Sequence, residues 1–326
     1  MGRVSPLSPG DSDIANQAAG RRRGSHWSGS AWPNITAIGA FSLFGGAVVA
    51  TRVVAQDIPP FTLAAVRIGI GAAILWALVL LFHRHGMRVE RRDWRLFFLL
   101  AAFYFTAFPL AMAFGFQVTE ASRGALLMAT SPVWSVALGR IFGRESLDLR
   151  QISGVVVSLI GIVLVFGETA LSPAESGGET VSTGAAIGGA ALLLFAAACV
   201  AVYGVASQRA FARYSAMNVT AWTMLIGALM LAPLALAKAA LGDTGGFDTQ
   251  NTLLMLYLGS LGLAQLMFVF SLTRLSPTQV VVYVNFNPLV AMALGAALLE
   301  ETLTGAFAVG AAAVIAGAVL VNWPKR

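Results

Sequence analysis

Residues 131–139 are SPVWSVALG and residues 287–295 are NPLVAMALG, so a proline and a closing Leu-Gly pair recur at an offset of 156 residues. A glutamate follows each copy at the same offset, Glu145 in the first and Glu301 in the second. Both stretches lie in long apolar runs, where a proline removes one helical hydrogen bond and kinks the helix. The paired segments predict a duplicated chain with one kinked helix in each half.

The composition indicates that this chain uses lipid as its solvent. Of its 326 residues, 57% are hydrophobic and 11% are charged, and the mean hydropathy is +0.77. An ordinary soluble domain has roughly 25% charged residues. The single cysteine, Cys199, excludes a disulfide framework and a Cys-rich metal site, and three histidines make multi-His metal chemistry unexpected. We therefore expect a membrane protein without a cofactor.

A helix needs about 20 mostly apolar residues to cross the roughly 30 Å of bilayer hydrocarbon. Such runs lack the alternating pattern of barrel strands, and an open sheet edge is not stable in lipid. The sequence therefore predicts an all-α integral membrane protein of ten transmembrane helices. The expected spans are 32–54, 61–82, 95–116, 121–142, 150–167, 184–207, 217–238, 251–273, 277–299 and 303–322.

The charges test this topology separately, because Lys and Arg concentrate in cytoplasmic loops. With the N-terminus inside, 17 of the 21 basic residues fall on the cytoplasmic side, and most acids fall outside. The basic exceptions are Lys238 and three arginines within spans or at their outer ends, Arg52, Arg67 and Arg123. One span more or fewer would invert every later loop and destroy this segregation. Both termini are therefore expected in the cytoplasm, and topology explains the net charge of +6 without a nucleic-acid partner.

The chain divides into two halves at the repeat offset. Spans 2, 3 and 4 align with spans 7, 8 and 9, and a half with five spans enters the membrane from the side opposite to its copy. This predicts two inverted five-helix repeats, the basis of alternating access in many carriers. The expected divisions are a disordered cytoplasmic tail at 1–31, repeats at 32–167 and 184–322, a linker at 168–183 and a cytoplasmic tail at 323–326.

These features resemble the drug/metabolite transporter superfamily, in its EamA-type branch of ten-span transporters. The resemblance covers about residues 32–322 and rests on the duplicated five-span layout, on Arg67 at the end of FTLAAVR (61–67), and on the paired proline segments. It implies export of a small metabolite, such as an amino acid, a nucleoside or a drug-like amphiphile, through a central cavity between the halves. The resemblance does not name the cargo.

Several polar residues and two prolines lie deep in the predicted spans. Pro132 and Pro288 are about eleven residues into theirs, so each is a candidate hinge or a static kink of the kind that membrane helices tolerate. Polar side chains at this depth face a partner helix or a water-filled cavity. The candidate cargo contacts of this kind are Ser131, Gln265, Tyr283, Asn285 and Asn287.

Aromatic residues within the spans form a second candidate set. They lie away from the interfacial belts, where membrane Trp and Tyr usually concentrate. Inside a bundle they either pack against other helices or give an amphiphilic cargo a flat apolar wall with one polar group. Besides Tyr283, the set comprises Phe44, Tyr104, Trp134, Tyr203 and Trp222.

Arg67 is the deepest charge, about six residues or ~9 Å from the outer end of span 2. Three roles are open: holding a substrate carboxylate, a clamp to Asp57 or Glu120, and snorkelling to the surface. No Asp or Glu lies near the middle of a span, whereas proton-driven antiporters commonly use a buried carboxylate or His. A facilitator or exchanger is therefore favoured, unless an end carboxylate such as Glu120 acts as the relay.

A membrane enzyme is the main rival class. The sequence has no HExxH and no Asp-rich metal motif, and His26, His83 and His85 lie outside the spans, away from any buried nucleophilic Ser. We expect a carrier of the cell inner (plasma) membrane that binds a small molecule between its halves and exports it by alternating access. A pore-like facilitator or a membrane scaffold is the alternative, and a homodimer is left open.

Overall fold

The computed structural model describes residues 32–82, 87–141, 182–243, 245–272, 286–300 and 304–322, together with short pieces between 149 and 180. Both predicted tails lie outside the described residues. Two predicted cargo contacts, Tyr283 and Asn285, also lie outside them.

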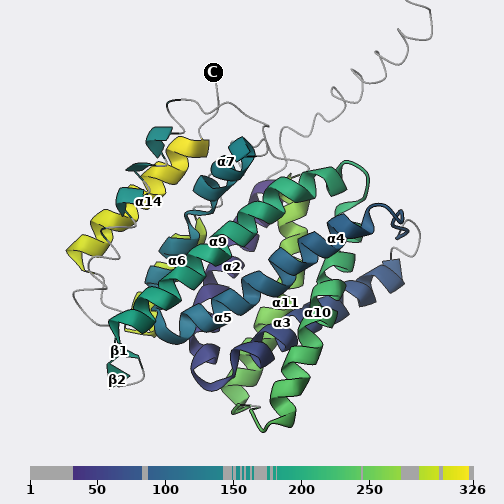
Figure 1. The fold of residues 1–326 in the computed structure, drawn as a ribbon, viewed down its shortest axis with the longest axis horizontal. Helices are drawn as coiled ribbons and strands as arrows, with labels where there is room; N and C mark the ends of the chain where they lie inside the picture. Colours follow the sequence, from purple (N-terminus) through teal and green to yellow (C-terminus); the bar gives the residue numbers. More distant parts are fainter. Residues whose placement is uncertain are drawn as a thin grey trace, which may run out of the picture.

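The first half of the chain is a series of helices, two of which are interrupted (Figure 1). The predicted third span has a π-helical section in its middle, and the predicted fourth span is two separate helices. Their bounds are α2 (Trp32–Asp57), α3 (Pro60–Phe82), α4 (Trp94–Leu100), η1 (Ala101–Ala107), α5 (Phe108–Val118), α6 (Ala121–Met128) and α7 (Ser131–Ile141).

The second half begins after a pair of two-residue antiparallel strands, β1 (Glu175–Ser176) and β2 (Glu179–Thr180). Three long helices follow, and two shorter helices complete the described chain. Their bounds are α9 (Thr183–Phe211), α10 (Ala216–Ala240), α11 (Thr249–Leu272), α13 (Phe286–Leu298) and α14 (Gly305–Asn322).

Six helical stretches are long and apolar enough to cross a bilayer, and each starts within three residues of a predicted span. They are 35–57, 60–81, 94–118, 183–211, 216–240 and 249–268. Shorter apolar stretches lie in α13 and α14. The structure thus confirms a helical protein with several membrane-spanning segments, and the count of ten stays a prediction.

The break in the predicted fourth span lies at Ala129 and Thr130, just before Pro132. Pro132 stands in the first turn of α7, where a residue without an amide hydrogen is well tolerated. The backbone amide and the hydroxyl of Thr130 both donate to the carbonyl of Leu127, at 3.2 and 2.6 Å, and so end the preceding helix. The predicted kink is a complete interruption, and its use as a hinge stays a prediction.

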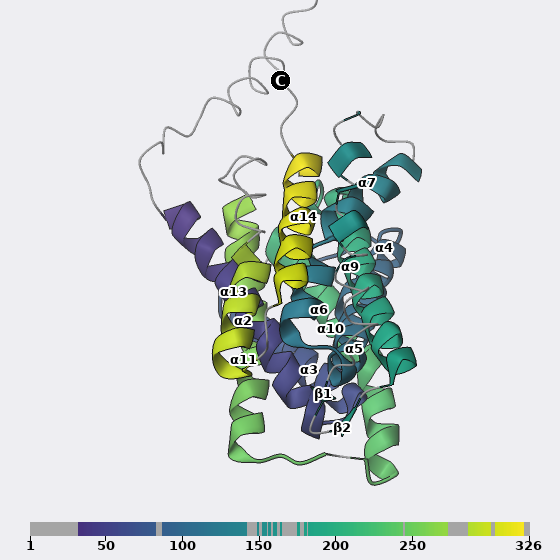
Figure 2. The same ribbon diagram turned by 90° about the vertical axis from the view of Figure 1, so that its left-hand side faces the viewer.

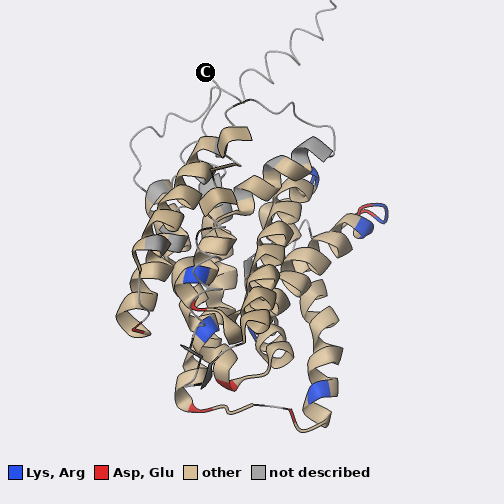
Figure 3. Cartoon of the chain, turned by 60° about the vertical axis from the view of Figure 1, so that its left-hand side comes forward, with Lys and Arg blue, Asp and Glu red and all other residues tan. Residues whose placement is uncertain are grey.

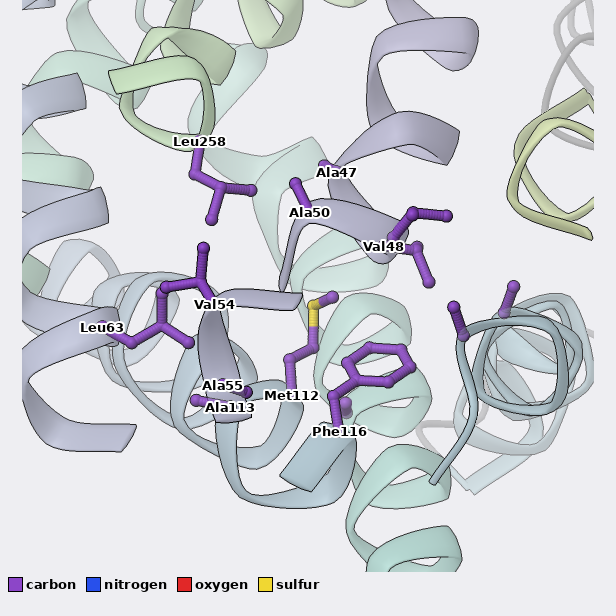
Figure 4. Packing of buried hydrophobic residues seen from close by; sticks show 14 of the residues in the cluster. Ala47, Val48, Ala50, Val54, Ala55, Leu63, Met112, Ala113, Phe116 and Leu258 are labelled. Carbon is purple, nitrogen blue, oxygen red and sulfur yellow. The ribbon is translucent and has the colours of Figure 1, made fainter. Parts of the chain in front are cut away.

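The helices of the two halves interleave, as the two views show (Figures 1 and 2). α2 packs against α11 and α13, α9 packs against α5 and α7, and α3 packs against α10 and α11. The largest core cluster joins small residues of α2, such as Ala47 and Ala50, with Met112 and Phe116 of α5 (Figure 4). Close packing of this kind holds membrane helices together, since lipid tails supply no hydrophobic force between them.

Candidate functional site

A cavity of about 40 Å³, room for a few water molecules, lies among α2, α3, α5, η1, α10 and α11. Four predicted cargo contacts line it: Phe44, Arg67, Tyr104 and Gln265. The rest of the lining is apolar or glycine, and comprises Ile68, Phe105, Phe108, Met224, Leu258, Leu261 and Gly262. The structure therefore brings one charge, one phenol and one amide into an otherwise apolar cavity.

The cavity lies where equivalent positions of the two halves meet. Ile68 and Met224 are 156 residues apart in the sequence, and so are Phe105 and Leu261. Both members of each pair line the same cavity. The sequence alone does not single out these four residues, because their side chains are those of any core, although the repeat offset pairs them.

Tyr104 and Phe105 lie in the π-helical section η1, which has a local cause. Pro109 follows in the first turn of α5 and has no amide hydrogen to donate to the preceding turn. The amide of Phe108 instead donates to the carbonyl of Phe103, five residues back. π-Helical turns are rare in proteins as a whole, but those that occur are frequently at functional sites. Here the turn carries two cavity-lining side chains.

Tyr104 is held on three sides. Its ring stacks on Tyr203, with centroids 4.2 Å apart, and on Phe108 at 5.3 Å and an interplanar angle of 3°. Its hydroxyl donates to Oε1 of Gln265, 3.3 Å away, so η1 and α11 are joined across the cavity. Tyr203 is buried behind this stack and is not part of the lining, so it supports the wall that Tyr104 forms.

Two of the three outer-end arginines have structural partners. Arg52 donates from Nη1 to the carbonyls of Phe116 and Gln117, at 2.6 and 3.0 Å. These are among the last carbonyls of α5, which have no partner within their own helix. Arg123 pairs through Nε with Glu120 at 3.2 Å.

Arg67 differs from both. Its one hydrogen bond within the described chain runs from Nη1 to the hydroxyl of Thr51, at 3.4 Å. The predicted clamp to Asp57 or Glu120 is wrong, because Oδ2 of Asp57 accepts from Asn251 and Glu120 pairs with Arg123. Arg67 lines the cavity instead.

Four other predicted contacts that the structure describes do not line this cavity. Ser131 and Trp134 lie on α7, where Trp134 is 37% exposed, and Asn287 lies on α13 with its carbonyl oxygen against Gly45 of α2. Trp222 lies on α10 and donates from Nε1 to the carbonyl of Met87, at 2.8 Å. The proposed cargo roles of these four residues therefore need a second region or another conformation.

An ionic link joins the two halves at the end of the bundle that carries the arginine-rich loop between α3 and α4, which includes Arg88, Arg91 and Arg92. Asp93, just before α4, accepts from the Tyr214 hydroxyl at 2.7 Å and pairs with Nη1 of Arg213 at 3.1 Å. The hydrogen bond from Tyr214 and the charge of Arg213 lower the pKa of Asp93. Nearby, Trp222 meets Trp76 and Trp94 edge to face, at 4.8 and 5.1 Å. We call Asp93, Arg213 and Tyr214 the basic-end link.

A second link closes the opposite end, where Figure 3 shows acidic residues in the lower loops. Asn251 is 3% exposed and donates from Nδ2 to Oδ2 of Asp57 and to the carbonyl of Gly246, both at 3.1 Å. Asp248 immediately precedes α11 and accepts from the backbone amide of Asn251 at 2.6 Å. We call Asp57, Asn251 and Gly246 the acidic-end link.

The two links occupy corresponding places in the halves. Asp57 and Arg213 are 156 residues apart, and each stands at or just beyond the end of the first long helix of its half. Asp93 and Asn251, which lie just before α4 and in the first turn of α11, are 158 residues apart. The repeat therefore places one inter-half link at each end of the cavity-bearing bundle.

A sequence profile of the EamA-like transporter family matches residues 31–167 and, a second time, residues 187–323. The chain belongs to the EamA-like transporter family. The two matches begin 156 residues apart, the offset at which the proline segments align. This family is the one that the sequence resembles, so the prediction of a multi-pass membrane transporter of the drug/metabolite superfamily is confirmed.

Curated relatives of this EamA-family chain are also named transporters. The uncharacterized transporter YoaV of Bacillus subtilis is 22% identical over 84% of this chain and 91% of its own length. A probable terminal-alkyne amino-acid exporter of Streptantibioticus cattleyicolor is 29% identical over 73% of this chain and 76% of its own. A solved crystal structure shares the fold, with a TM-score of 0.59 at 22% identity over 88% of this chain and 94% of that one.

Proposed function

We propose that this EamA-family protein is a secondary transporter of the cell inner (plasma) membrane that exports a small organic solute by alternating access. The observation that carries the proposal is the cavity lined by equivalent positions of both halves, Ile68 with Met224 and Phe105 with Leu261. The relative from Streptantibioticus cattleyicolor, which is named an amino-acid exporter, supports the direction.

The packing of the helices favours two inverted halves related by a pseudo-two-fold axis. If such an axis exchanges the halves, contacts between them must occur in pairs. The contact of α2 with α11 corresponds to that of α9 with α5. The contact of α2 with α13 corresponds to those of α9 with α6 and α7, and the contact of α3 with α11 corresponds to that of α10 with η1. α3 on α10 and α6 on α13 are their own counterparts. With ten spans and both termini in the cytoplasm, the basic end faces the cytoplasm.

The cavity is too small for a solute the size of an amino acid, so the halves must separate at one end to admit it. The basic-end link and the acidic-end link join the halves at opposite ends. We infer that each link opens in turn while the other holds, and Pro132 and Pro288 are the proposed hinges. This mechanism distinguishes a carrier from a pore, in which both ends are open at once.

The cavity lining favours exchange or facilitated transport over proton antiport. Within the described chain, the lining holds no Asp, Glu or His that could relay a proton. Glu120, the end carboxylate considered for that role, is paired with Arg123. An imposed pH gradient should therefore leave the flux unchanged.

Counterflow tests the proposal once a cargo is in hand. Metabolite profiling of cells that lack or overproduce the protein identifies solutes whose export depends on it. The purified full-length protein is then placed in proteoliposomes, and uptake of the labelled solute is followed with and without unlabelled solute inside. A carrier accelerates uptake when unlabelled solute waits on the far side. Uptake that is indifferent to internal solute would contradict alternating access and favour a pore.

A further inference from the structure

We propose that the cargo is an organic monocarboxylate with an apolar body, held at the carboxylate by Arg67. This deepens the proposed transport function and rests on it, because the site is the same cavity. The inference comes from the partners of the arginines: Arg52 donates to two carbonyls of α5 and Arg123 pairs with a carboxylate, whereas the described chain offers Arg67 one long hydrogen bond to a hydroxyl.

The guanidinium of Arg67 has donors to spare. A guanidinium carries five N–H donors, and the described protein offers Arg67 one acceptor, the hydroxyl of Thr51, at the long distance of 3.4 Å. A charge removed from water without a partner is strongly destabilising. An anion in the cavity satisfies both the charge and the remaining donors, and a carboxylate matches the planar fork of the guanidinium in a bidentate pair.

The two other polar groups of the cavity are placed to assist an anion. Tyr104 gives its proton to Oε1 of Gln265, which orients the amide so that its NH₂ group remains as a donor. That NH₂ group has no hydrogen-bond partner within the described chain. Arg67 on α3 and Gln265 on α11 thus line the same cavity, and within the described chain each has N–H donors to spare.

The rest of the lining indicates which chemical groups, apart from the carboxylate, the cargo can carry. Phe44, Phe105 and Phe108 with Met224 make an apolar wall, which suits an aromatic or branched aliphatic body. Within the described chain no carboxylate lines the cavity, so a cationic amine has no counter-charge there. One arginine balances one negative charge, so a doubly charged phosphate monoester is a poorer match than a carboxylate.

Three probes of the same shape separate these possibilities. They are 3-phenylpropanoate, its neutral amide 3-phenylpropanamide and the cation 3-phenylpropylamine, tested at neutral pH and constant ionic strength. Binding to the full-length protein in detergent is measured as the ligand-dependent rise in the unfolding temperature, since a ligand that binds the folded state stabilises it. We expect the carboxylate to stabilise the protein at concentrations about tenfold or more below those needed of the amide or the amine.

Matched variants assign that preference to one side chain. Arg67→Gln should weaken the carboxylate about tenfold or more and remove its advantage over the amide. Arg67→Lys keeps the charge but loses the bidentate geometry, so it should retain part of the advantage. Arg52→Gln is the control, because it removes an arginine that donates to the last carbonyls of α5. It should lower the unfolding temperature without changing the preference for the carboxylate over the amide.

Each other outcome overturns the inference. Equal stabilisation by carboxylate and amide, a preference for the amine, or no stabilisation by any probe is incompatible with an anion site at Arg67. A preference that survives in Arg67→Gln places the anion elsewhere. Counterflow keeps the two proposals separate: a neutral or cationic cargo that shows counterflow leaves the transport proposal standing and refutes this one.

Discussion

At the basic end of the bundle the two halves are joined by a carboxylate, a guanidinium and a phenol, whereas at the acidic end the corresponding positions are joined by a carboxamide and a carboxylate. The side chain of Arg213 is 50% exposed, while Asn251 is 3% exposed. Exposed ion pairs contribute about 0–1 kcal/mol, and leaving a buried polar group without its partner costs about 1–3 kcal/mol. The buried amide is thus the firmer of the two links.

The comparison shows how a duplicated fold becomes asymmetric while its contacts stay paired. The same two places in each half are joined, so the geometry of opening is shared between the ends. The side chains differ, so charge, pH and salt act on the two ends unequally. Under the proposed alternating access, the end with the stronger link should stay closed for longer, and here that is the acidic end.

A reporter cysteine in the cavity shows separately whether the basic end or the acidic end of the bundle is open. Cys199 is the only cysteine in the sequence and is buried, so Cys199→Ala gives a cysteine-free background. Leu261→Cys then places one thiol in the cavity lining. An impermeant maleimide added to right-side-out or inverted vesicles labels this thiol when the end facing the reagent is open.

The largest effect is expected from Asn251→Asp. This change places a second carboxylate against Asp57, where the amide nitrogen now lies 3.1 Å from Oδ2. Two like charges at that distance repel, so labelling from the acidic end should exceed that of the parental protein about tenfold or more at neutral pH. This excess, measured against the parent at the same pH, should fall in acid, when the pair shares a proton. Thr252→Ala, at the neighbouring position of α11, is the control. Labelling of Asn251→Asp that stays at the parental level at all pH values would show that this link does not close the acidic end.

A smaller effect is expected from Asp93→Asn at the basic end. The amide oxygen still accepts from Tyr214, but the charge that pairs with Arg213 is lost. Because Arg213 is half exposed and water replaces its partner, labelling from the basic end should rise by about fivefold or less. The emission of the nearby tryptophans should shift to the red as Trp222 leaves the carbonyl of Met87. An effect as large as that of Asn251→Asp would reverse the ranking of the two links.

Much of this asymmetry could not be predicted from the sequence. The spans, the repeat offset and the family follow from apolar runs and the two proline segments, because lipid imposes length and helicity on the chain. Arg67, Tyr104 and Gln265 could be chosen as candidates because polar groups within spans are costly. That these three residues converge on one cavity could not be predicted, since it depends on how η1 and α11 pack.

The two links were hidden for a different reason. Asp93, Arg213, Asp57 and Asn251 lie at helix ends, where polar residues are ordinary and carry no signal of their own. Their partners are up to 194 residues away in the chain. The repeat offset that pairs Asp57 with Arg213 is a signal that the sequence does contain, although identical residue types do not mark it.

Lowering the pH should leave the basic end of the wild-type protein unchanged until strongly acidic conditions. The hydrogen bond from Tyr214 and the charge of Arg213 lower the pKa of Asp93 below its usual value of about 3.9. A depressed pKa means that the carboxylate favours the closed basic end at every pH above that usual value, and this is lost only as the pH falls through the lowered pKa. Reporter labelling from the basic end, divided at each pH by the labelling of the same thiol in the unfolded protein, should therefore stay constant between about pH 8 and pH 5. A rise within that window would mean that another group titrates the link.

Salt should cause the smallest measurable change in labelling, and this change separates an ionic link from an amide link most directly. Raising the ionic strength from about 0.1 M to 1 M shortens the Debye length from about 10 to 3 Å, which weakens an exposed ion pair and leaves a buried amide hydrogen bond unchanged. Labelling from the basic end should therefore rise by less than about threefold, while labelling from the acidic end stays constant. In Asp93→Asn the salt response should disappear, because the ion pair is already absent. A response that persists in this variant would assign it to the arginine-rich loop as a whole, and equal responses at both ends would remove the distinction between an ionic and an amide link.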